Sequence, residues 1–61
     1  MRAPILINEN GDVSSFASVE DAEAYMEPVD VERGEYLITD ADGRQLSAVV
    51  ITEETPVLRG L

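Results

Sequence analysis

The chain has 61 residues and a formal net charge of −9 at pH 7, because 13 acidic residues stand against four arginines and no lysine. It contains neither histidine nor cysteine, which excludes Ser-His and Cys-His catalysis, disulfide frameworks and ordinary zinc, haem and copper sites. Four scattered arginines cannot neutralise the phosphates of a nucleic acid, and the net negative charge disfavours binding to anionic membranes. No apolar run is long enough to span a bilayer. We therefore expect one soluble, cytoplasmic domain without metal or cofactor.

The N-terminal segment has the pattern of a β-hairpin. Residues 4–8 are short, apolar and β-branched, which favours a strand. Asn10 and Gly11 follow, and this pair is typical of a type I′ turn because both central residues need positive φ. Residues 13–16 are the expected return strand.

Two registers of this hairpin are open on the sequence alone. A two-residue loop pairs Ile5 with Phe16 and places both on the face of Ile7. A three-residue loop instead groups Val13 with the two isoleucines. The pattern does not decide between these registers.

Residues 18–28 predict one amphipathic helix. Ser18 is a suitable N-cap, and Pro28 is expected to end the helix because the residue before a proline avoids the α region. The apolar side of this helix comprises Val19, Ala22, Tyr25 and Met26. A separate acidic stripe comprises Glu20, Glu23 and Glu27. We expect the two tyrosines of the chain, Tyr25 and Tyr36, in the core, with a position at the rim as the alternative.

The second half of the chain predicts a connector and another hairpin. Residues 29–34 are the connector, which Val29 and Val31 would hold to the core, and residues 35–39 and 45–52 are strands. A three-residue loop at residues 41–43 gives the cleaner separation of faces, with Gly43 in the left-handed position of a bulge.

This register has consequences for both faces of the hairpin. It pairs Asp40 with Arg44 and Ile38 with Leu46. One face then carries Tyr36, Ile38, Leu46, Ala48 and Val50. The other carries Leu37, Thr39, Gln45, Ser47, Val49 and Ile51. Because residues 49–51 are apolar on both faces, we expect that end of the strand to be covered on both sides.

The order of elements predicts the fold class. Residues 53–61 are compatible with a short edge strand, a docked turn or a frayed tail. The rest reads β-β-α-β-β, which predicts an α+β domain over residues 1–61, with an antiparallel sheet of about four strands and one helix packed on one face.

No motif indicates an enzyme or a calcium site. The segment from Asp40 to Gly43 has the composition of an EF-hand loop, but that alignment places Ile38 and Val49 where carboxylate ligands are required. The segment is better interpreted as a hairpin loop. Close pairs of carboxylates are inevitable in so acidic a chain, and a domain this small has little room for a water-excluding pocket, so we expect no catalysis.

Charge is concentrated in one part of the sequence. Between residues 20 and 35 there are seven acidic residues and only Arg33 opposes them. Either these side chains form a solvated face that keeps the protein soluble, or they form an anionic surface that steers a basic partner. The candidate binding residues are Glu20, Glu23, Glu27, Asp30, Glu32 and Glu35.

A family resemblance covers about residues 13–47. The pattern S-x-E-x-A-x-x-Y-x-E-P-x-D-V is matched by Ser18, Glu20, Ala22, Tyr25, Glu27, Pro28, Asp30 and Val31. A G-E-Y triplet is matched by Gly34, Glu35 and Tyr36, and a D-x-x-G-R turn by Asp40, Gly43 and Arg44. In these motifs the chain resembles small bacterial immunity-type proteins that accompany polymorphic toxins. The resemblance implies a non-catalytic protein that neutralises a toxin by binding it.

Two functional hypotheses follow. The first is an immunity or inhibitor protein whose acidic surface occludes a basic protein effector, such as a nuclease. The second is a structural module that forms a homo-oligomer through Leu37, Val49 and Ile51 on the second face of the sheet.

Overall fold

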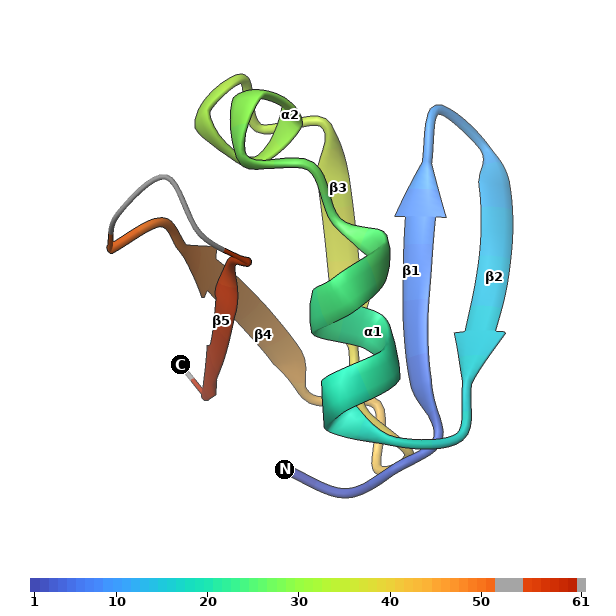
Figure 1. Cartoon of the computed structure of the whole chain (residues 1–61). Coiled ribbons are helices and arrows are strands. Elements are labelled where there is room, and N and C mark those ends of the chain that lie inside the picture. The colour runs from blue at the N-terminus through green and yellow to red at the C-terminus, as the bar shows by residue number, and fades with distance from the viewer. Residues whose placement is uncertain (52–54, 61) are drawn as a thin grey trace.

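The computed structural model describes residues 1–51 and 55–60 (Figure 1). This part of the chain forms an antiparallel five-stranded sheet and two short helices, which confirms the predicted α+β class. The strands are β1 (Ile5–Glu9), β2 (Asp12–Phe16), β3 (Tyr36–Thr39), β4 (Gln45–Val49) and β5 (Val57–Gly60). The helices are α1 (Val19–Tyr25) and α2 (Pro28–Glu32). The described residues therefore form one strand and one helix more than the expected four strands and one helix.

The first hairpin adopts the two-residue loop. Ile5 lies opposite Phe16, and Ile7 lies opposite Ser14. Asn10 has φ of 54° and Gly11 has φ of 95°, so both turn residues occupy the positive-φ region that the Asn-Gly pair favours. This register places Phe16 on the core face with the two isoleucines.

Helix α1 begins as expected and ends earlier. The Ser18 hydroxyl accepts a hydrogen bond from the Asp21 backbone N–H at 3.1 Å, which caps the first turn. Ala22 and Met26 are buried against the sheet, and Val19 packs beside them. The backbone becomes extended at Met26, so the helix has seven residues.

A second helix replaces most of the predicted connector. Glu27 is extended, as the residue before a proline should be, and Pro28 then occupies the first turn of α2. Proline therefore begins a helix here in addition to ending one. Because α2 is helical, Val29 and Val31 point in different directions: Val31 packs on the core and Val29 is exposed.

The sheet has the strand order β2-β1-β3-β4-β5, and α1 lies across one of its faces (Figure 1). Strand β1 pairs with β3, which places Ile7 opposite Ile38. The buried hydrophobic core lies between this face and the helices. It consists of Ile5, Ile7, Ala22, Met26, Ile38, Leu46 and Leu58.

The predicted register of the second hairpin is confirmed. Ile38 lies opposite Leu46, and the Asp40 N–H donates to the Arg44 carbonyl at 3.0 Å across the three-residue loop. Gly43 has φ of 78°, as the bulge requires. Strand β4 ends at Val49, and Ile51 is 64% exposed, so the prediction that this end is covered on both sides is wrong for Ile51.

Strand β5 pairs with β4 and forms one edge of the sheet. Val49 lies opposite Val57, and Leu58, opposite Ala48, enters the core. Of the alternatives for residues 53–61, residues 57–60 adopt the edge strand, whereas residues 53, 54 and 61 lie outside the described residues. Neither α1 nor α2 has the length and apolar character that crossing a bilayer requires.

Candidate functional site: a tyrosine–carboxylate surface

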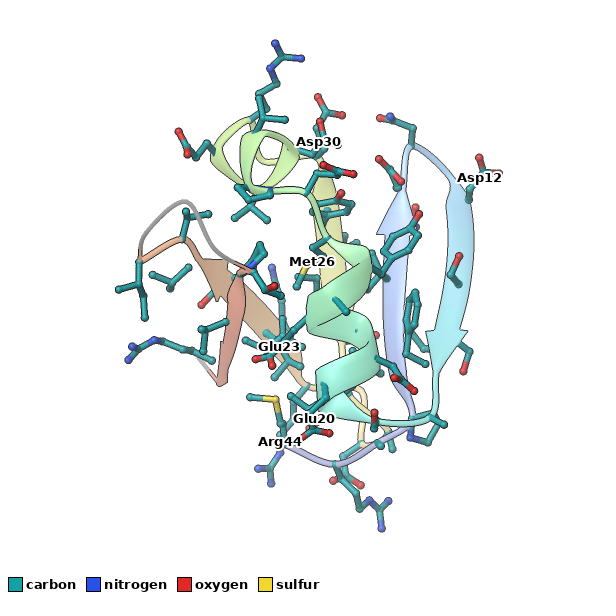
Figure 2. All side chains as sticks on the ribbon, in the orientation of Figure 1. Asp12, Glu20, Glu23, Met26, Asp30 and Arg44 are labelled. Atoms are coloured by element: carbon teal, nitrogen blue, oxygen red, sulfur yellow. The ribbon has the colours of Figure 1, made fainter. Side chains whose placement is uncertain are left out.

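The structure does not bring the six acidic candidate residues onto one surface. Glu20 lies at the start of α1, while Asp30 lies at the opposite end of the helical layer (Figure 2). Glu32 is exposed at the end of α2. The predicted acidic stripe of Glu20, Glu23 and Glu27 requires one continuous helix. Because the backbone becomes extended at Met26, Glu27 does not lie on the same helix face as Glu20 and Glu23.

Glu23 has a structural contact. Its Oε2 atom accepts a hydrogen bond from the Leu58 backbone N–H at 2.8 Å. This bond ties the middle of α1 to the edge strand β5, and it leaves Glu23 half-buried. Glu23 therefore serves the fold, and it is not part of a free anionic stripe.

Tyr36 contacts two of the predicted acidic residues, Glu27 and Asp30. Its hydroxyl accepts from the Glu27 backbone N–H at 3.1 Å and donates to Asp30 Oδ2 at 3.4 Å. Next to it in sequence, Glu35 Oε2 accepts from the Asn10 amide at 3.3 Å, which links this region to the tip of the first hairpin.

Tyr25 lies at the rim, which corrects its predicted core position. It is 42% exposed, and its hydroxyl donates to Glu9 Oε1 at 2.9 Å. Its ring packs against Phe16 with centroids 4.9 Å apart and lies 6.2 Å from the ring of Tyr36. These aromatic neighbours and the bond to Glu9 fix the position of a ring that remains partly exposed.

Glu9 is a site residue that sequence reasoning missed. It ends β1 opposite Tyr36, because β1 pairs with β3. Nothing in the local pattern signals this pairing, since β2 and both helices lie between the two strands in the sequence. The contact between Glu9 and Tyr25 follows from that pairing and from the placement of α1 over β1.

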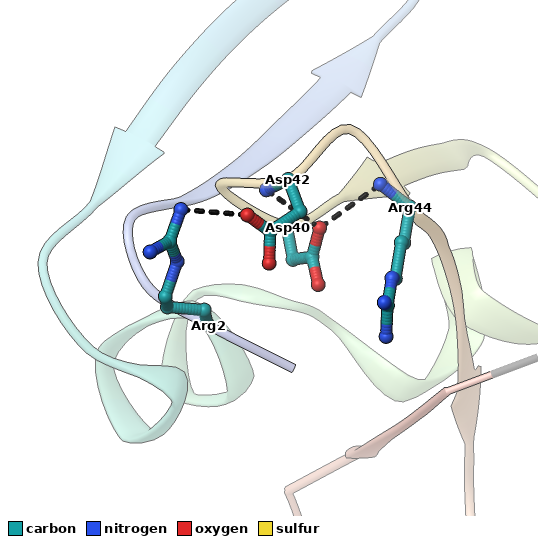
Figure 3. Close-up of polar contacts among 4 residues, drawn as sticks. All are labelled: Arg2, Asp40, Asp42 and Arg44. Atoms are coloured by element: carbon teal, nitrogen blue, oxygen red, sulfur yellow. Dashed lines mark hydrogen bonds and ion pairs between the residues drawn. The ribbon is translucent and has the colours of Figure 1, made fainter.

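We call the resulting feature the tyrosine–carboxylate surface. It comprises the two tyrosines, Tyr25 and Tyr36, and four acidic residues beside them, Glu9, Glu27, Asp30 and Glu35. Among residues 1–51 and 55–60, the one ion pair joins Arg2 and Asp42 at 2.6 Å. That pair belongs to the loop between β3 and β4, so it does not neutralise this surface (Figure 3).

The negative charge of the surface acts on its two phenols. The pKa of Tyr25 is raised above its ordinary value, chiefly by the hydrogen bond to the Glu9 carboxylate. Desolvation and the negative charges of Glu9 and Asp12 contribute less. Burial, supported by the charges of Asp30 and Glu9, raises the pKa of Tyr36. Both hydroxyls therefore stay protonated hydrogen-bond donors well above neutral pH.

The geometry suits contact with a positively charged surface. Its carboxylates are spread around an aromatic pair, and within the described ranges no three acidic side chains converge closely enough to hold a metal ion. An exposed tyrosine flanked by carboxylates presents both an apolar face and an anionic rim to a partner. The chain matches no protein-family model, no curated protein and no solved structure.

Proposed function

We propose that this protein is a non-catalytic binding protein of the immunity or inhibitor type, which occludes a basic protein effector such as a nuclease. One observation carries the proposal: the carboxylates of Glu9 and Asp30 accept hydrogen bonds from the neighbouring hydroxyls of Tyr25 and Tyr36, and neither carboxylate forms an ion pair within the described part of the chain. The motifs shared with immunity-type proteins support it, because Tyr25, Glu27, Asp30 and Glu35 belong to those motifs.

The mechanism has an electrostatic and a steric part. The anionic field draws a basic partner toward this end of the sheet and raises the association rate. Tyr25 then supplies a rigid anchor, whose ring stacks on an arginine or lysine of the partner while Glu9 holds its hydroxyl in place. The bound domain covers the effector's cationic surface, which an effector acting on nucleic acid needs for its phosphates.

Two charge-matched double variants test this proposal. Glu27→Gln with Glu35→Gln removes two charges from the surface, and Glu20→Gln with Asp21→Asn removes two from the start of α1. At low salt we expect the first pair to recover severalfold less basic partner in a pull-down from the native cell, with the second pair close to the unmodified protein. The difference should shrink as salt rises, because exposed charges are screened.

A purified oligoarginine peptide makes the same test with a defined probe. Its binding should shift the amide resonances of Glu9, Tyr25 and Glu35 first, and those of residues 19–21 only at higher peptide concentration. Equal partner recovery by the two double variants, together with peptide shifts spread evenly over the protein, would refute the electrostatic proposal.

A second candidate function is supported by the other face of the sheet. The register places Leu6, Val13 and Leu37 on the face opposite the helices, where all three are exposed. No acidic residue of the five described strands points to this face, and its one charged residue is Arg59. A second copy of this acidic chain would meet least repulsion there, which favours a homodimer as the alternative.

Sedimentation distinguishes this alternative from the first proposal. If the sheet faces of two copies meet, the protein should sediment as a dimer, and Leu37→Asp should return it to a monomer because a charge would be buried at the contact. Ala24→Asp, which adds the same charge at an exposed position of α1, should leave the dimer intact. A native protein that is monomeric at high concentration would exclude the alternative.

A further inference from the structure

Strand β2 leaves one edge of the sheet open. It lies at the end of the strand order, and no strand of the described part of the chain pairs with its outer side (Figure 1). In a hairpin with a two-residue loop, the pair that closes the loop is hydrogen-bonded, and hydrogen-bonded pairs then alternate along the strands. Because Asp12 closes the loop, its backbone groups and those of Ser14 face β1. The backbone N–H and C=O groups of Val13 and Ser15 therefore point outward.

This edge lacks the features that usually protect an edge strand. Strand β2 contains no proline, its register with β1 is free of bulges, and Asp12 is its one charged residue. Val13 is 61% exposed. The other edge strand differs, because the Leu58 N–H of β5 already donates to the Glu23 carboxylate at 2.8 Å. The outward groups of β2 are thus a free row of donors and acceptors, which is a template for another strand.

The two faces of β2 present different chemistry to an added strand. On the helix side, Asp12 lies opposite Glu9 of the tyrosine–carboxylate surface, and the Phe16 ring packs against the Tyr25 ring with centroids 4.9 Å apart. Val13 points to the other face, which carries the exposed apolar side chains described above. Successive side chains of an added strand would therefore lie alternately beside carboxylates and beside an apolar face.

We propose that β2 accepts an extended segment of the basic partner as a further antiparallel strand, in a sheet whose described pairs are all antiparallel. The segment alternates basic and apolar residues. Its basic side chains lie beside Asp12 and Glu9, and its apolar side chains extend the face of Val13. The inference rests on the proposed function and adds the mode of recognition: charge attracts the partner, and the strand edge fixes its direction and register.

Two peptides of equal composition test whether the order of side chains matters. The peptide RVRVRVR alternates arginine and valine, whereas RRVVVRR has the same charge without the alternation. In a titration of the ¹⁵N-labelled protein at low salt, RVRVRVR should bind severalfold more tightly than RRVVVRR. It should also slow the hydrogen exchange of the Val13 and Ser15 amides, while the Ser14 amide, which already pairs with β1, changes little.

Methylation of the peptide backbone separates strand addition from charge. In the proposed register the valine N–H groups of RVRVRVR face β2, because the valines share a face with Val13 and Ser15. Methylating the three valine nitrogens should weaken binding at least roughly tenfold, since the hydrogen bonds to the edge are lost. Methylating the nitrogens of the three arginines that follow them leaves charge and methyl count equal, and this peptide should bind like the unmethylated one.

A variant of the protein makes the same test from the other side. Val13→Pro removes the outward N–H but none of the groups that pair with β1, and an edge strand tolerates proline at such a position. It should weaken RVRVRVR binding severalfold, whereas Val13→Ile, which keeps the N–H, should bind like the native chain. If Val13→Pro disturbs the hairpin, the two methylated peptides decide the proposal on the native chain.

Strand addition and the proposed function fail in different ways. Equal affinities of the two methylated peptides would overturn strand addition, although the double variant Glu27→Gln with Glu35→Gln should still weaken both. Unchanged binding by that double variant would instead overturn the proposed function, with the contrast between the methylated peptides still reporting on β2. Exchange protection of Val13 and Ser15 that rises with the concentration of the protein alone would assign the edge to a second copy, which would also overturn strand addition by a basic partner.

Discussion

Replacing Ile7 by alanine is expected to unfold most of the protein at room temperature. Ile7 is 1% exposed and lies opposite Ser14 in β2 and Ile38 in β3, so its side chain sits in the middle of the core. Truncating a buried isoleucine to alanine costs about 2–5 kcal/mol. A domain of this length has only about 3–5 kcal/mol of stability, so the loss approaches the whole of it.

Urea denaturation followed by circular dichroism measures this loss, and the neighbouring residue provides the control. Leu6→Ala removes a similar volume from the opposite face of the same strand, where the side chain is 37% exposed. We expect Leu6→Ala to lower the free energy of unfolding by about 1 kcal/mol or less. Equal losses at the two positions would mean that the core does not lie on the face that α1 covers.

The second large effect is expected at Glu23, which was a candidate for partner binding in the sequence. Glu23→Ala leaves the Leu58 N–H without its acceptor and releases the contact between α1 and the edge strand β5. The bond is charge-assisted and half-buried, so we expect a loss of about 1–2 kcal/mol in the free energy of unfolding. The Leu58 amide should also exchange with solvent much faster than in the native protein.

Two variants on the same helix control this prediction. Glu23→Gln keeps an oxygen acceptor and should retain most of the stability, whereas Glu20→Ala removes an exposed carboxylate and should change it by about 0.5 kcal/mol at most. If Glu23→Ala behaves like Glu20→Ala, the bond to β5 contributes nothing in solution. Partner-binding experiments should leave Glu23 unmodified, because its loss acts through the fold.

The fold was predictable wherever a short-range signal was strong. The Asn10-Gly11 turn, the Ser18 cap and the Gly43 bulge each depend on the conformational preference of one or two residues, and the structure places all three as expected. The sequence pattern does not predict the second helix, because Pro28 there indicates only the end of the first one. Both roles follow from the pyrrolidine ring of Pro28. The ring disfavours the α conformation at the preceding residue, Glu27, and it fixes a helical φ at Pro28 itself.

The candidate site was less predictable, because it depends on pairings between distant segments. The concentration of acidic residues was visible, but a charge count does not show which carboxylates face one another. The structure separates Glu20 and Glu23 from Asp30, and it adds Glu9, which the pairing of β1 with β3 brings next to the tyrosines. Helical periodicity predicts Tyr25 in the core, yet the structure places it beside Glu9 of β1 and Phe16 of the edge strand β2, where it is 42% exposed.

The strand order has a consequence for how fast the chain can fold. The pairs β1–β2, β3–β4 and β4–β5 join neighbours in sequence, so each can form by a short search. The pair β1–β3 is the exception in the sheet, because it closes a loop that contains β2 and both helices. The entropy of closing this loop is lost before the contacts of the pair are gained, so we expect the docking of the first hairpin onto β3, with α1 folding over the face of the joined strands, to limit the folding rate.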